Sequence, residues 1–284
     1  MANVVIDDTN LTNIAAAIRE KNGSTDTYKP NEMAAAIRAI SGGGDTPASS
    51  IDFEDYIGRT LTGEVELTCA RVGSYGLAGF WNVNKFIVHS TVPGNNVFTG
   101  CTNLQEINIT KEATIGKNAC NGLTKLTTVN APLATEIGER AFASCSALTN
   151  VTLGDVTRLD RYAFEGCNKL TKIDLGNTEQ AHSYYSLWVG PYLYDSVFSG
   201  CYALTAIIIR GKVPCCLSQY NCPFPSHFRT DYVGDLEPGY IYVPRAMISE
   251  YQNYQANISG MSPYYDHFTM MNYRAIEDYP EICG

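Results

Sequence analysis

The chain has 284 residues, of which 45% are hydrophobic and 17% are charged, so it can bury a sizeable core and is not generally disordered. Its 20 basic and 29 acidic side chains give a net charge of −9 without any Lys/Arg cluster, so binding to nucleic acid or anionic membranes through bulk charge is not expected. No run approaches the ~20 apolar residues needed to span a bilayer, so membrane insertion is not expected either.

The first residues, MANVVIDDTNLTN, lack the basic region and apolar stretch of a secretory signal. We therefore expect the protein either to be assembled into a particle or released by a route that needs no signal, or to stay in the cytoplasm.

Residues 1–40 predict a small helical hairpin. Apolar residues recur at helical spacing in LTNIAAAIREK and again in PNEMAAAIRAI, with the turn NGSTDTY between them. The hairpin resembles a short module of minor structural proteins from phages and prophages of Gram-positive bacteria, which implies docking to a particle. Residues 41–50, SGGGDTPASS, have the composition of a flexible linker.

A repeat follows the linker. The spacing Phe-x-x-Cys-x-x-Leu-x-x-Ile-x-Ile recurs six times, and the first residues of the copies are Leu77, Phe98, Cys120, Phe142, Phe164 and Phe198. Successive copies are 21 or 22 residues apart, except the last, whose step of 34 contains a 12-residue insertion. One copy has too few apolar residues for its own core, so the copies must stack as coils of a solenoid.

Each part of the repeat predicts a local structure. The Ile-x-Ile end alternates like a half-buried strand and should pair in parallel with neighbouring coils, which would stack the Phe and Cys positions into ladders. Glycines follow an apolar residue just before the repeat, at Gly73, Gly116 and Gly138, and predict corners with positive φ. The repeated cysteines, Cys101, Cys145, Cys167 and Cys201, fit buried packing positions better than metal ligands.

These residues resemble the bacterial leucine-rich repeats of the BspA-like surface-protein type. IGERAFASCSALTNVTL from Ile137 and LDRYAFEGCNKLTKIDL from Leu159 match its pattern at nearly every place, and the resemblance covers about residues 65–210. It implies an α/β-type repeat solenoid, a right-handed coil with a parallel strand ladder and six coils of about 22 residues. The first copy departs from the pattern at Leu77 and Phe80, and the third at Cys120 and Leu123, by apolar exchanges that keep the buried role.

The C-terminal stretch GYIYVPRAMISEYQNYQ resembles the cap that closes such arrays, with a strand through Tyr242 and Val243, then Pro244 and a helix from Arg245 to Tyr254. The expected organisation is a docking hairpin over 1–40, a linker over 41–50, a solenoid with an N-terminal cap over 51–239 and a C-terminal cap over 240–284.

Two surfaces are candidates for ligand binding. The insertion lies in HSYYSLWVGPYLYDS and carries the aromatic residues Tyr184, Tyr185, Trp188, Tyr192 and Tyr194, which suit protein hot spots or stacking on sugars but could also merely cover the last coils. The second surface is the outward face of the strand ladder, where Ala206 and Ile208 extend a mostly polar sheet whose candidate ligand residues are Asn108, Asn130, Thr152 and Asp174.

Motifs for catalysis or cofactor binding are not found in the sequence, so an enzyme and a cofactor are not expected. Three thiols and an imidazole lie close together in PCCLSQYNCPFPSHF, at Cys215, Cys216, Cys222 and His227. They could bind zinc, but the spacing fits no standard zinc site, and a local disulfide or reduced thiols in an irregular loop are the alternatives.

The leading hypothesis is a non-enzymatic adhesion or binding protein that recognises a protein or a cell-surface glycan, displayed on a phage-like particle through residues 1–40. A structural spacer of the particle is the main alternative, and a surface hydrolase is the least favoured.

Overall fold

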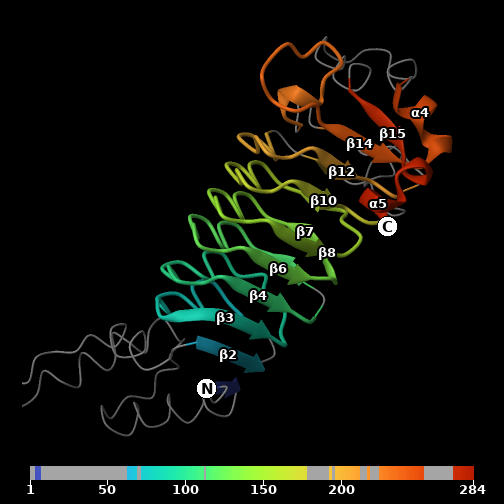
Figure 1. Cartoon of the computed structure of the whole chain (residues 1–284). Coiled ribbons are helices and arrows are strands. Elements are labelled where there is room, and N and C mark those ends of the chain that lie inside the picture. The colour runs from blue at the N-terminus through green and yellow to red at the C-terminus, as the bar shows by residue number, and fades with distance from the viewer. Residues whose placement is uncertain are drawn as a thin grey trace, which may run out of the picture.

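Stacked parallel strands form the body of the protein in the computed structural model (Figure 1), which describes residues 4–7, 63–68, 72–111, 113–177, 192–193, 196–211, 216–217, 224–252 and 271–284. The chain advances by one coil per repeat along a single axis, so the molecule is elongated and neighbouring coils share its core.

The first strand ladder is built from the Ile-x-Ile segments. Six parallel strands form one sheet: β1 (Val4–Asp7), β2 (Gly63–Thr68), β3 (Val83–Val88), β4 (Glu106–Ile109), β6 (Thr128–Ala131) and β8 (Asn150–Leu153). Four more continue it as a second parallel sheet: β10 (Lys172–Asp174), β12 (Ala206–Ile208), β14 (Tyr240–Val243) and β15 (Tyr273–Ala275). Ile107 pairs with Val129 and Val129 with Val151, so the parallel ladder predicted from the repeat is confirmed.

A second ladder was missed by the sequence analysis. Its short strands pair in parallel: β5 (Ala113–Ile115), β7 (Ala134–Ile137), β9 (Arg158–Leu159), β11 (Tyr192–Leu193) and β13 (Cys216–Leu217). The first four precede the repeat copies that begin at Cys120, Phe142, Phe164 and Phe198. Ile115 pairs with Ile137 and Ile137 with Leu159, and each of the three is the apolar residue five positions before the first residue of a repeat copy. Segments of two to four residues with few buried side chains are too short to show a strand period.

The corner glycines do not have the backbone conformation that we predicted. Gly73, Gly116 and Gly138 are absent from the positive-φ residues of the described chain. Positive φ occurs instead two residues before and two residues after the first residue of each repeat copy, as at Asn118 (φ 54°) and Gly122 (φ 77°) around Cys120. The corner glycines serve close stacking: a Cβ at Gly116 would lie 2.1 Å from the carbonyl oxygen of Gly94 in the preceding coil.

The interior contains the predicted ladders. The rings of Phe142 and Phe164 stack at 5.2 Å, and those of Phe164 and Phe198 at 5.7 Å. Four repeated thiols are buried, and each donates to a main-chain carbonyl of the preceding coil; they are Cys101, Cys145, Cys167 and Cys201. Burial raises the pKa of Cys145 to about 12, which fits a packing role and not a reactive thiol.

The ends of the chain add elements to both sheets. β1 pairs with β2, so residues 4–7 belong to the ladder although the sequence analysis predicted no strand there. The helical hairpin was predicted over 1–40, so β1 departs from it at residues 4–7. The rest of that range and the linker over 41–50 lie outside the described residues. At the other end, β14 is followed by a 3-10 helix (Arg245–Met247) and α4 (Ile248–Gln252), and a 3-10 helix (Ser226–Phe228) precedes β14.

The last described segment continues from β15 into a 3-10 helix (Ile276–Asp278) and α5 (Pro280–Cys283). Across the described ranges, no helix has the length and apolar character needed to cross a bilayer.

Candidate binding surface

The outer face of the first ladder forms two columns of side chains, because alternate residues of each strand point outward. One column runs through Glu64, Lys85, Glu106, Thr128, Asn150, Lys172, Ala206 and Tyr240. The other runs through Glu66, Ile87, Asn108, Asn130, Thr152, Asp174, Ile208 and Tyr242. The predicted strand-face residues therefore all lie in the second column. The columns change character along the axis and divide the face into three sections.

The N-terminal section is charged. Lys85 Nζ lies 3.0 Å from Glu64 and 3.3 Å from Glu106, and these carboxylates, Glu64 first, raise the pKa of Lys85. His89 Nε2 donates to Glu66 Oε1 at 2.7 Å. Asn108 donates to Glu106 at 2.9 Å, so this predicted ligand residue is already engaged.

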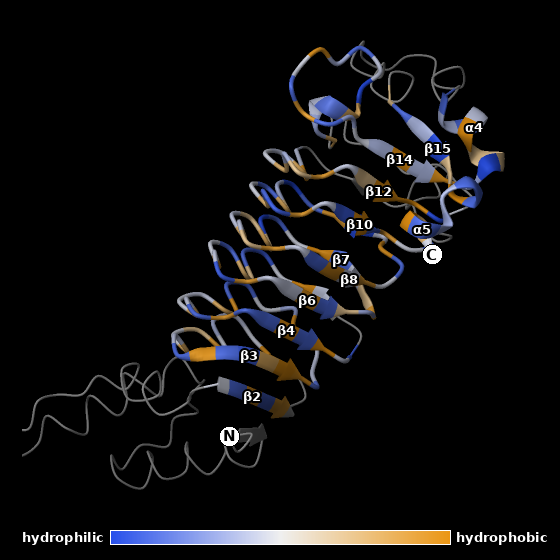
Figure 2. Cartoon of the chain, viewed as in Figure 1, coloured by the Kyte–Doolittle hydropathy of each residue, from blue (hydrophilic) through white to orange (hydrophobic). Residues whose placement is uncertain are grey.

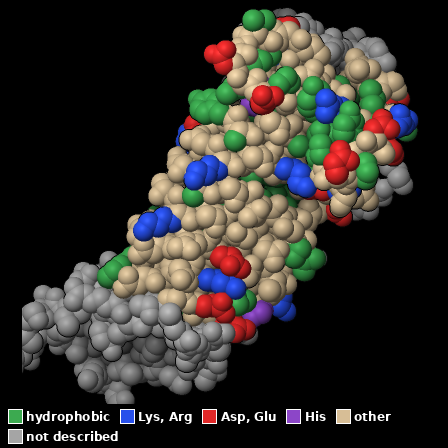
Figure 3. All heavy atoms as spheres, in the orientation of Figure 1, with side chains coloured by type: hydrophobic (Ala, Val, Ile, Leu, Met, Phe, Trp, Pro, Cys, Tyr) green, Lys and Arg blue, Asp and Glu red, His purple; other side chains and the backbone are tan. Residues whose placement is uncertain are grey.

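The middle section carries no charge and is open to solvent. It comprises the outward residues of β6 and β8: Thr128, Asn130, Asn150 and Thr152. Thr128 is half-buried and the other three are exposed. Within the described part of the chain, none of the four side chains makes a hydrogen bond. Figure 3 shows a group of red and blue side chains near the lower end of the described chain and more near the upper end, with a mostly tan surface between them that carries separate blue side chains along its left edge.

The C-terminal section is covered. Ala206 and Ile208 point outward, as predicted, but they are only 5% and 1% exposed, so the expectation that they extend an open polar sheet is wrong. The segment from 276 to 283 packs over them. A strand pattern gives the outward direction of a residue but not whether a distant segment returns to cover it.

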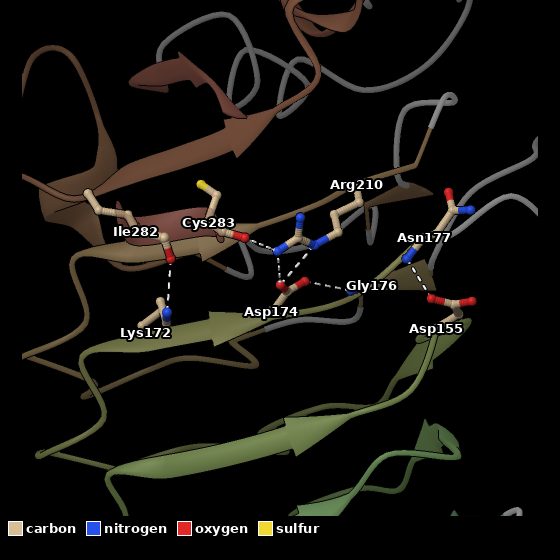
Figure 4. A network of polar contacts seen from close by, with 8 residues as sticks. All are labelled: Asp155, Lys172, Asp174, Gly176, Asn177, Arg210, Ile282 and Cys283. Atoms are coloured by element: carbon tan, nitrogen blue, oxygen red, sulfur yellow. Dashed lines mark hydrogen bonds and ion pairs between the residues drawn. The ribbon is translucent and has the colours of Figure 1, made fainter. Parts of the chain in front are cut away.

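Asp174 is not free to bind a ligand. Its carboxylate accepts hydrogen bonds from Arg210 Nε at 2.9 Å and Arg210 Nη2 at 2.7 Å, and from the amide of Gly176 at 2.9 Å (Figure 4). Asp174 therefore belongs to the contacts beneath the segment from 276 to 283. Of the four predicted strand-face residues, Asn130 and Thr152 remain uncommitted.

The aromatic insertion falls mostly outside the described residues, which exclude Tyr184, Tyr185, Trp188 and Tyr194. Tyr192 lies in β11, where it pairs in register with Arg158 of β9. The insertion therefore joins β10 of the first ladder to β11 of the second.

The side chains of most of the proposed metal ligands lie outside the described part of the chain. His227 is 1% exposed and its Nε2 donates to the carbonyl oxygen of Leu204 at 2.6 Å. Cys216 lies in β13 and pairs with Tyr192, while Cys215 and Cys222 lie outside the described residues. Among the residues that the structure describes, no three His, Cys, Asp or Glu side chains form a group able to hold a metal ion.

Comparison with known proteins identifies the repeat. A family model described as "BspA type Leucine rich repeat region (6 copies)" matches residues 64–146 and 90–188. A leucine-rich repeat protein from Bacteroides ovatus ATCC 8483 is 18% identical, with 76% of this chain and 52% of that chain covered at a TM-score of 0.43. The T. pallidum Leucine Rich Repeat protein is 17% identical, with 57% and 78% covered at a TM-score of 0.29.

This chain thus covers about half the length of the Bacteroides ovatus protein. A search of curated proteins finds no match.

Proposed function

We propose that this chain, whose residues 64–188 match BspA-type leucine-rich repeats, is a non-catalytic binding protein that holds a protein partner on the middle section of its strand face. The observation that carries the proposal is the set of exposed, uncommitted amides and hydroxyls on β6 and β8. Extended faces of this kind are the surfaces that solenoids use for partners.

The chemistry of the middle section favours an uncharged polar partner surface. Asn side chains offer both donors and acceptors, and Thr hydroxyls do the same, on strands that lie about 4.8 Å apart. The paired strands fix the backbone from which these side chains project, so binding must order the side chains but not the backbone. The charged N-terminal section would then fix the orientation of the partner more than its affinity.

A bulky charge in the middle section tests this proposal. Thr152→Arg should weaken binding of the labelled chain to intact cells and to arrays of proteins at least about tenfold, because the new side chain fills the contact surface. Thr114→Arg is the matched control, since Thr114 is an exposed residue of β5 on the other ladder. Equal binding by both variants and the unchanged chain would exclude the middle section as the contact.

We also propose that the insertion recognises a glycan, because it carries several aromatic residues. Alanine at Tyr185 and Trp188 should weaken ligand binding by about 2 kcal/mol if they form a hot spot. A glycan array probed with the unchanged chain and this double variant distinguishes the surfaces. Loss of signal only in the double variant assigns the glycan to the insertion, whereas an array blank for both chains removes the glycan proposal.

Display on a phage or prophage particle through residues 1–40 is supported by the resemblance of the hairpin. Because β1 belongs to the ladder, the informative deletion removes residues 11–40 and keeps Val4–Asp7. We expect loss of immunogold labelling on particles with ligand binding retained. If the deletion abolishes assembly into particles and the full chain binds no ligand in any assay, the chain is better explained as a structural spacer.

A further inference from the structure

The outward residues of the ladder change from polar to apolar where β12 begins. Figure 2 shows β4 and β10 largely blue and β12 orange. Ala206 and Ile208 occupy the register positions held by Lys172 and Asp174 in β10. These apolar residues on the outer face are buried by another segment of the chain.

A separate apolar cluster lies on this face, outside the core of the solenoid. Ala206, Ile208 and Tyr242 form its floor, and Cys283 is buried against them. Half-buried residues complete the cluster: Tyr240, Ile276, Tyr279 and Ile282. We call residues 276–283 the cover and its floor on β10, β12 and β14 the seat.

The polar contacts of the seat are made to the backbone of the cover. Lys172 Nζ donates to the carbonyl oxygen of Ile282 at 2.9 Å. Arg210, held by Asp174, donates to the carbonyl oxygen of Cys283. Figure 4 shows the two carbonyls pointing toward these side chains. The seat therefore binds apolar side chains and main-chain carbonyls, which many different peptide sequences can supply.

Cys283 is the one fully buried side chain of the cover, and its remaining contacts lie near the surface. The exposed Glu277 accepts a hydrogen bond from the amide of Arg245, and the exposed Asp278 pairs with the Arg245 guanidinium. The half-buried Tyr279 ring lies 4.7 Å from the Arg274 guanidinium carbon. Surface ion pairs of this kind contribute little to stability. The helices of the cover have three and four residues. Segments with few buried apolar contacts open locally at low free energy, whereas the strands of the seat are paired on both sides in β12 and β14.

We propose that the seat is a second binding surface, which the cover occupies in this structure and vacates to admit an apolar peptide segment of a partner protein. The ligand places two apolar or aromatic side chains, spaced like Tyr279 and Ile282, on Ala206 and Ile208. Its carbonyls face Lys172 and Arg210. The seat is distinct from the middle section, so this proposal does not depend on the function proposed above.

Opening of the cover can be measured on the unaltered chain. Cys283 becomes accessible to a thiol reagent when the cover lifts, whereas Cys101, Cys145, Cys167 and Cys201 are buried within the coils. Alkylation mapped residue by residue with mass spectrometry should label Cys283 at least about 100-fold faster than those four. Labelling of all five at one slow rate would show that the cover opens only with global unfolding and would overturn the proposal.

Occupancy of the seat is tested with a fluorescent peptide of residues 271–284. Ile282→Asp removes an apolar contact of the cover and should speed Cys283 labelling at least tenfold. The variant should then bind the peptide at least tenfold more tightly than the unaltered chain does. The proposal is contradicted if the Ile282→Asp variant melts cooperatively but its Cys283 is labelled no faster than in the unaltered chain. It is also contradicted if the folded variant does not bind the peptide.

A matched pair of substitutions locates the peptide. Added to Ile282→Asp, Ile208→Asp should abolish peptide binding. Ile87→Asp should leave it unchanged, because Ile87 occupies the same column on β3 outside the seat. Equal loss of binding with both substitutions would show that the peptide does not bind at the seat.

Discussion

Backbone atoms of neighbouring coils approach closely where Gly94, Gly116 and Gly138 stack. A Cβ at Gly116 would lie 2.1 Å from the oxygen and 2.6 Å from the carbon of the Gly94 carbonyl, which no side-chain rotation can relieve. The first glycine of the series, Gly73, has nothing within 4 Å of an added Cβ. The same repeat position is therefore strictly constrained inside the stack and unconstrained at its beginning.

Gly116→Ala should lower the free energy of unfolding by at least about 3 kcal/mol, since coils must separate to admit the methyl group. Gly73→Ala, its matched control, should change it by less than about 0.5 kcal/mol. Urea denaturation followed by circular dichroism measures both. Equal stability of the two variants would mean that the coils can shift apart without cost.

Because of the buried thiols, we expect the free energy of unfolding to fall as the pH rises above 8.5. Burial raises the pKa of Cys101 and Cys145 to about 12 in the folded chain, against ~8.5 for an unfolded thiol. Above pH 8.5 the unfolded chain loses thiol protons that the folded chain keeps, so each thiol lowers the free energy of unfolding by about 1.4 kcal/mol per pH unit up to pH 12.

The unaltered chain should therefore lose stability more steeply between pH 8.5 and 10 than a Cys101→Ala/Cys145→Ala variant. Urea denaturation in the presence of a reductant checks this. Parallel curves for the two chains would show that these thiols do not titrate on unfolding in that range.

Among the strands, the first ladder is interrupted between β8 and β10. The two strands fall in separate sheets, although their repeats are 22 residues apart like their neighbours. Val151 and Leu153 on β8 are half-buried, whereas the equivalent Val129 and Ile173 are 1% exposed. The coils are still joined beyond the strands, where the amide of Asn177 donates to Asp155 Oδ1 at 2.6 Å.

This interruption predicts faster amide exchange at the start of β10. The amides of Thr149 and Asn150 both donate to the carbonyl of Thr127, but within the described residues no bond links Thr171 to Thr149 in the same way. Hydrogen exchange should be at least about tenfold faster at Thr171 and Lys172 than at Thr149 and Asn150. Similar protection at all four would place β8 and β10 in one continuous sheet.

At the scale of the whole molecule, the repeat made the coil architecture predictable from sequence. Inward positions such as Ile107 and Phe142 recur at fixed spacing because each must meet its equivalent in the next coil. The pairing of β1 with β2 was not predictable, because four residues carry no period and the partner strand lies more than 50 residues away.

The candidate surface was predictable in its direction but not in its accessibility. Register alone placed Asn130, Thr152 and Ile208 on the outer face. Ile208 is buried because the segment at 276–283 packs over it. The sequence of β12 contains no periodic pattern that would predict this contact. Long-range cover of this kind depends on where the chain returns, which periodicity does not encode.

If the coils are equivalent units, one can be removed without loss of the fold. Deleting residues 116–137 joins Ile115 to Gly138 and places the coil of Phe142 directly on that of Phe98, with the Phe and Cys positions in register. Because each coil contacts only its neighbours, the shortened chain should fold cooperatively with a lower melting temperature. Deleting only residues 116–126 leaves half a coil, misaligns both ladders and should unfold the neighbouring coils. Circular dichroism melting separates the two cases, and equal unfolding of both deletions would show that the coils are not interchangeable.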